Sequence, residues 1–154
     1  MNTLDKVFGE LEYEYGWNGK VKLEVFGKEQ IIDLIISGEN DDTFVTWQYD
    51  SFNYFIRKWS LIQEDMKNKI YKYYCQLRTE LGYYDDSVGY PLLNNVNDII
   101  EHIEIDAIVI PVIGVYKERC INIVLSCTWD DENGIGVRVL NEAVDEVGYQ
   151  DIAF

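Results

Sequence analysis

Apolar and polar residues alternate in the first part of the chain. Every second residue from 11 to 15 is apolar, and Glu10, Glu12 and Glu14 occupy the positions between them. The same period returns at residues 21–25, after a turn that is rich in Gly and Asn. Two alternating runs across such a turn predict a β-hairpin with one exposed face.

A third β-rich run follows, and the period then changes to nearly four. The run covers residues 31–36, and the next apolar residues are spaced three or four apart. This spacing places them on one side of a long helix that ends at Gly82, and whether the helix breaks near Ser60 stays open. The helical residues are Phe52, Ile56, Trp59, Ile62, Met66, Ile70, Tyr73, Leu77 and Leu81.

The last third returns to β structure after a short helical segment. Asn95 precedes Asp98 by three residues, a pattern typical of a helix N-terminus. Strand-like runs then cover residues 105–116 and 121–129. Asn133-Gly134 predicts a hairpin turn, since both residues tolerate positive φ. Further strands follow it, the last at about residues 144–148.

The order of these elements predicts the fold class. Strands segregate from helices instead of alternating with them, which is typical of α+β proteins. We expect a mainly antiparallel sheet, made of an N-terminal hairpin and a C-terminal meander, with one long helix packed on one face. A chain of 154 residues also predicts a single domain over residues 1–154.

The charge excludes some functions. The formal net charge is -15, and a protein that docks on phosphates needs a basic face, so we expect no nucleic acid partner. The apolar stretch at residues 107–116 is too short to cross a bilayer, and the first residues carry no secretory signal. We therefore expect a cytoplasmic protein that does not bind membranes.

The charge is also uneven along the chain. Residues 43–82 carry a net charge of +2, whereas residues 1–42, 83–129 and 130–154 carry -6, -5 and -6. If the helix covers one face of the sheet, the other face exposes Glu10, Glu12 and Glu14. Such a face serves solubility or meets a basic protein.

A second acidic segment lies beside a tryptophan. Trp129 is followed by Asp130, Asp131 and Glu132, three consecutive carboxylates at the tip of a predicted hairpin. They could hold a hard cation, contact a basic side chain, or remain solvated. The spacing differs from the calcium loop, in which acidic residues alternate with other residues.

Catalytic and metal-binding patterns are absent from the sequence. His102 is the only histidine, and Cys75, Cys120 and Cys127 match no zinc-binding spacing. No phosphate-binding loop, nucleophile elbow or zinc-protease motif occurs. We predict no catalytic residue, no metal ligand and no cofactor.

Five short segments together resemble a known family. They are VFGEL at 7–11, VFGK at 25–28, CTWD at 127–130 with GIGV at 134–137, and VGYQDI at 147–152. They are similar to an uncharacterised family of small acidic bacterial proteins, a domain of unknown function. The resemblance implies the order hairpin, helix and meander over nearly the whole chain. Some relatives resemble immunity proteins of bacterial toxin systems, and the family implies no catalytic residue.

The leading hypothesis is a non-enzymatic binding protein, of the immunity type, that contacts a basic protein through an acidic sheet face. One alternative is a cation-dependent or enzymatic protein that uses residues 130–132. Another is a structural homodimer that pairs through an exposed strand at residues 11–15. The candidate contact residues are Glu10, Glu12, Glu14, Trp129, Asp130, Asp131 and Glu132.

Overall fold

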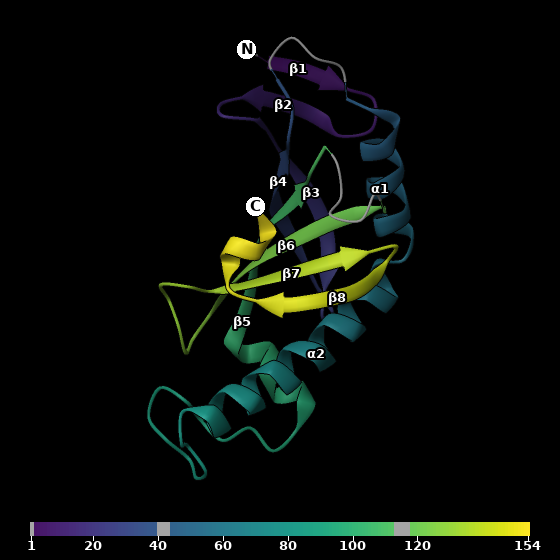
Figure 1. Cartoon of the computed structure of the whole chain (residues 1–154). Coiled ribbons are helices and arrows are strands. Elements are labelled where there is room, and N and C mark those ends of the chain that lie inside the picture. The colour runs from purple at the N-terminus through teal and green to yellow at the C-terminus, as the bar shows by residue number, and fades with distance from the viewer. Residues whose placement is uncertain (1, 40–43, 113–117) are drawn as a thin grey trace.

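One sheet of eight strands runs through the molecule, with helices packed on it (Figure 1). The computed structural model describes residues 2–39, 44–112 and 118–154. The strands follow one another in sequence order across the sheet. They are β1 (Asn2–Asp5), β2 (Gly9–Tyr13), β3 (Trp17–Val25), β4 (Lys28–Ile36), β5 (Ile103–Ile110), β6 (Cys120–Cys127), β7 (Ile135–Leu140) and β8 (Ala143–Gly148).

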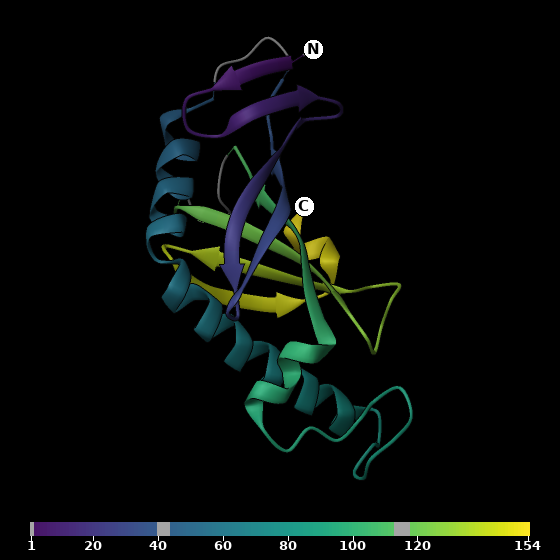
Figure 2. The ribbon, with the colours of Figure 1, turned by 180° about the vertical axis from the view of Figure 1, so that it is seen from behind.

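The predicted long helix is two helices. α1 (Thr46–Arg57) and α2 (Trp59–Glu80) meet at Lys58, whose φ of -102° and ψ of 9° leave the helical region. The chain changes direction there (Figure 2). The break contains neither Gly nor Pro, and buried Phe55 and Trp59 continue the apolar spacing across it. The expectation of one helix is therefore wrong.

Two short 3₁₀ helices complete the described chain, η1 (Val96–His102) and η2 (Gln150–Ala153).

The α+β class and the mainly antiparallel sheet are confirmed, but the sheet is larger than a hairpin plus a meander. All neighbouring strands are antiparallel except β4 and β5, which are parallel and are joined through the helices. Parallel neighbours need such a crossover connection. The predicted β2–β3 hairpin pairs over only two positions, whereas β3 and β4 pair over nine. β1 was not predicted.

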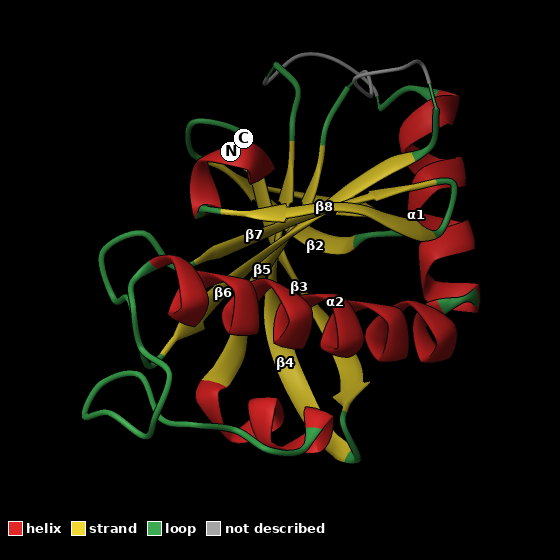
Figure 3. Ribbon diagram, turned by 60° about the horizontal axis from the view of Figure 1, so that its bottom comes forward, coloured by secondary structure: helices red, strands yellow, loops and turns green. Residues whose placement is uncertain are grey.

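The two faces of the sheet differ in what covers them. α2 crosses one face (Figure 3), where Ile36, Ile123 and Val137 pack with Met66 and Ile70 of the helix, all fully buried. On the other face a smaller apolar cluster joins strands β5 and β6 to the C-terminal helix η2. The outward face of β1 to β4 has mostly exposed side chains.

None of the helices in the described part of the chain is long and apolar enough to cross a membrane.

Candidate functional site

β2 directs the predicted glutamates to the outside. Leu11 is 2% exposed and points into the core, so Glu10 and Glu12 on either side of it point outward and are exposed. Glu14 follows the end of the strand and is also exposed. The alternating pattern thus predicted the orientation of these three residues correctly.

The three glutamates line one shallow groove of about 790 Å³. Its walls come from strands that lie side by side: β1 on one side of β2, and β3 and β4 on the other. β1 contributes Asn2 and Leu4, which lie directly opposite Glu12 and Glu10. Sequence reasoning missed these β1 residues, because β1 is exposed along most of its length and shows no apolar alternation.

The lysines on this side of the sheet already have acidic partners. Lys20 forms an ion pair with Asp33, and the Nζ atom of Lys22 lies 3.0 Å from an Oε atom of Glu29. All four side chains are more than half exposed, so these pairs contribute little stability. Lys20 and Asp33 both line the groove, so their pair adds no net charge there, and within the described ranges no cation pairs with the three glutamates.

An aromatic residue stands next to these carboxylates. Tyr15 follows Glu14, has φ of 58° and is fully exposed. Its neighbour Trp17 differs: it is 3% exposed, packs edge-on against Tyr13 at 5.2 Å, and donates its indole N–H to the carbonyl of Glu39. Tyr15 is therefore the aromatic of this turn that solvent or another molecule can reach.

The second predicted segment, at residues 129–132, is built differently. Trp129 is 7% exposed, and its ring centroid lies 4.5 Å from that of Tyr74 on α2. The Tyr74 hydroxyl donates to the carbonyl of Pro91, and this bond fixes the ring. Trp129 is therefore a core residue, not an exposed anchor for a partner.

The carboxylate of Asp130 stabilises its own loop. Its two oxygens accept hydrogen bonds from the backbone N–H and the side-chain amide of Asn133, at 3.0 and 2.9 Å. Gly134 closes the turn with positive φ and a hydrogen bond to the Asp130 carbonyl. Asp131 and Glu132 remain exposed. In the described chain no three carboxylate, thiol or imidazole side chains form a group able to hold a metal ion.

Burial disfavours thiolate chemistry beside this loop. Burial raises the pKa of Cys127, although hydrogen bonds to the backbone of residues 129 and 130 oppose the shift. Burial likewise raises the pKa of Tyr73 to about 12, with the Tyr149 hydroxyl and the Cys127 thiol adding to it. The Cys127 thiol is thus protonated at neutral pH and is a poor nucleophile.

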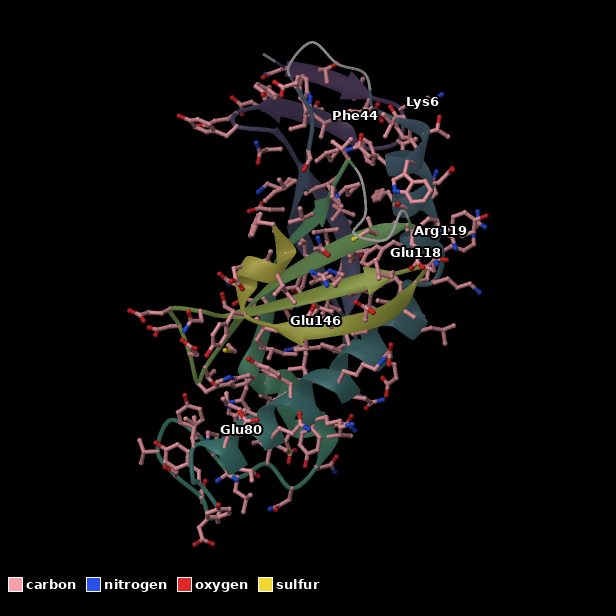
Figure 4. All side chains as sticks on the ribbon, viewed as in Figure 1. Lys6, Phe44, Glu80, Glu118, Arg119 and Glu146 are labelled. Atoms are coloured by element: carbon pink, nitrogen blue, oxygen red, sulfur yellow. The ribbon has the colours of Figure 1, made fainter. Side chains whose placement is uncertain are left out.

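The two acidic segments lie far apart. Both Figure 1 and Figure 2 place β2 near the N-terminal end of the molecule and the β6–β7 loop well below it. Other carboxylates lie elsewhere again: Glu80 near the end of α2, Glu118 beside α1, and Glu146 on β8 (Figure 4). The expectation that acidic residues gather on an uncovered sheet face holds for Glu10, Glu12 and Glu14 but not for residues 130–132.

The structure also corrects the predicted dimer strand. β2 contains most of residues 11–15 and pairs with β1 on one side and with β3 on the other. Its backbone is not free to pair with a second copy.

Most of the chain matches one known protein family. The model of a domain of unknown function, DUF6985, matches residues 7–154. The chain belongs to this family. The matched region runs from the residues just before β2 to the C-terminus, so β1 precedes it. No curated protein and no solved structure shows significant similarity to this member of DUF6985.

Proposed function

We propose that this DUF6985 protein is a non-enzymatic binding protein and that it contacts a basic protein partner through the groove over β1, β2 and β3. The observation that supports it is the convergence of Glu10, Glu12 and Glu14 on one open groove, whose lysine, Lys20, is paired with Asp33 and not with these glutamates. An immunity protein, which binds and blocks a toxin, is one class that works through such a surface, and this class stays a prediction.

At such a surface the charged and the apolar side chains have different roles. The carboxylates attract a basic partner over a distance of about 10 Å at 0.1 M salt, and they raise the association rate more than the affinity. Exposed Tyr15 and Leu4, which is 77% exposed, supply apolar area next to the charges. Aromatic side chains of this kind contribute a large share of the binding energy at interfaces.

The residues of the β6–β7 loop do not join this surface. Trp129 and Asp130 serve the fold, and the β6–β7 loop, which carries exposed Asp131 and Glu132, lies far from β2 (Figure 1). The cation-dependent alternative that uses residues 130–132 therefore has no structural observation in its favour.

The experiment compares two triple variants of equal net charge. Glu10→Gln with Glu12→Gln and Glu14→Gln removes the three glutamate charges of the groove, whereas Glu101→Gln with Asp131→Asn and Glu132→Gln removes three exposed charges elsewhere. Deca-lysine serves as the basic probe, and calorimetry at about 10 mM and about 1 M salt measures its affinity, since the screening length falls from about 30 Å to about 3 Å.

The groove variant should bind deca-lysine at least about fivefold more weakly than the wild type at low salt, which corresponds to roughly 1 kcal/mol. The matched control should lose less than about twofold, and high salt should remove the difference. Equal losses in both variants would mean that only the net charge matters, and the proposal would then be wrong.

A further inference from the structure

The two edge strands of the sheet, β8 and β1, differ in what covers them. At β8, side chains of helix α2 form hydrogen bonds with the backbone of the edge strand. Asp65 accepts a hydrogen bond from the N–H of Val144 at 3.1 Å, and Lys69 donates to the carbonyl of the same residue at 2.9 Å. An ion pair between Asp65 and Lys69 holds both side chains in place. Covering an edge in this way prevents another strand from pairing with it.

The opposite edge, β1, has no comparable cover among the residues that the structure describes. β1 is the first strand in the sheet order, and only β2 pairs with it. Asn2, Thr3 and Leu4 are exposed, and Asp5 is half-buried. β1 therefore presents backbone N–H and C=O groups that an extended chain can bond.

The position of β1 determines which chain fits. Asn2 and Leu4 share the outward face with Glu12 and Glu10, which they oppose in register. Side chains on the same face of an added strand would lie two strand spacings from β2, or about 10 Å. Lysine and arginine reach across this distance, with their methylene stems over Leu4 and their charges at the glutamates.

The same geometry disfavours a second copy of this chain. Pairing of β1 with another β1 about a two-fold axis would bring two sets of Glu10 and Glu12 onto one continuous face. The lysines of the groove side, Lys20 and Lys22, are already paired with Asp33 and Glu29, so each copy adds more negative than positive charge to this face, and the two copies repel each other there. A basic segment removes this repulsion instead of doubling it.

We infer that the partner docks as an extended basic segment, which adds to the sheet as a further strand beside β1 and places alternate lysine or arginine side chains over Glu10 and Glu12. This inference rests on the proposed function and specifies the form of the partner that the groove takes. Backbone bonds to β1 supply the alignment, and the two glutamates select the alternating charge.

The test uses two peptides of about nine residues with the same composition, near the upper end of ordinary strand lengths. In one, lysine and threonine alternate; in the other, all lysines come first. Calorimetry gives the affinity of each for the whole chain, and hydrogen exchange by NMR follows the amides of residues 3–5 in β1 with and without peptide.

The alternating peptide should bind at least about tenfold more tightly than the clustered one, and β1 amides should exchange at least about tenfold more slowly in its complex. Glu10→Gln with Glu12→Gln should remove this preference while leaving the backbone protection of the free protein unchanged. Equal affinities with no added protection of β1 would overturn the inference.

The result also separates this inference from the proposed function. If both peptides bind equally but the groove variant still weakens both, the basic partner stands and strand addition is wrong. If the groove variant and its matched control behave alike toward both peptides, the proposed function fails and the inference falls with it. Slowed exchange of β1 in the free protein at high concentration, with a doubled mass in sedimentation, would assign the edge to a second copy instead.

Discussion

Two acidic segments that look alike in the sequence have opposite roles in the structure. Around β2 the glutamates alternate with apolar residues, so the strand turns Glu10 and Glu12 outward while Leu11 enters the core. In the β6–β7 loop the acids are consecutive, and the loop uses Asp130 as an internal acceptor and buries Trp129. Spacing, more than the number of charges, decides which segment forms a surface.

The tryptophan gives the largest expected contrast. Trp129→Ala should lower the free energy of unfolding by about 3–5 kcal/mol, because a buried indole leaves a cavity against Tyr74. Tyr15→Ala should change it by less than about 0.5 kcal/mol, since Tyr15 is fully exposed. Urea unfolding of both variants measures the difference, and similar losses would contradict the assignment of Trp129 to the core and Tyr15 to the surface.

The second largest effect is expected at the β8 edge, which α2 covers. Asp65→Ala with Lys69→Ala removes both side-chain bonds to Val144, which should cost about 1–2 kcal/mol and expose the β8 edge. Sedimentation should then show association that grows with concentration. Lys72→Ala with Glu80→Ala alters two exposed residues of the same helix without touching Val144 and is the control. A variant that remains monomeric at all concentrations would show that α2 does not protect this edge.

The acidic residues themselves should separate the two segments more finely. Asp130→Ala should cost about 1 kcal/mol, because it removes the acceptor of two hydrogen bonds from Asn133. Glu12→Gln should fall within about 0.5 kcal/mol of the wild type, since no described cation depends on it. Thermal or urea unfolding distinguishes them, and a loss at Glu12 as large as at Asp130 would refute the distinction.

A smaller effect concerns the bond that anchors β1. The Tyr49 hydroxyl donates to Asp5 at 2.6 Å. Burial raises the pKa of Asp5, but this bond and the N–H groups of Phe8 and Val7 outweigh it, so the pKa lies below 3.8. For Tyr49, burial first and then Asp5 raise the pKa from 10.0 to about 12.

The signs of the two shifts define a pH window. The contribution of Asp5 is present above pH 3.8 and is lost as the pH falls through its lowered pKa. The contribution of Tyr49 is present below pH 10 and is lost as the pH rises toward 12. Tyr49→Phe should therefore differ most from the wild type between these limits. Urea unfolding across pH checks this, with Tyr15→Phe as the control; a pH-independent difference would contradict it.

Much of the fold follows from the periodicity of the sequence. The alternation around Leu11 and Val21 correctly predicted strands β2 and β3, and Gly82 ends the helical region at a φ of +83°. A break near Ser60 was left open and lies at Lys58; the sequence could not decide it, because no Gly or Pro marks the break and the apolar spacing continues through it. β1 was missed because a strand held mainly by backbone pairing leaves no apolar pattern.

The candidate site was predictable where side chains follow the pleat of a strand. Burial of Leu11 orients Glu10 and Glu12 outward, and the alternating pattern of the sequence is enough to predict this orientation. The environment of Trp129 depends on Tyr74, which lies 55 positions earlier in the chain and 4.5 Å away in space. Such long-range contacts leave no local signal, so composition alone suggested an exposed tryptophan beside the acids.

The most direct test of the acidic groove is a map of the amides that respond to a basic ligand. Deca-lysine is titrated into the ¹⁵N-labelled protein at low salt, and the shift of each amide is followed by NMR. The account predicts that the largest shifts fall in β1, β2 and the start of β3, including Glu10 and Glu12, with small ones at Asp131 and Glu132. Shifts of equal size at both segments, or the largest at the β6–β7 loop, would contradict it.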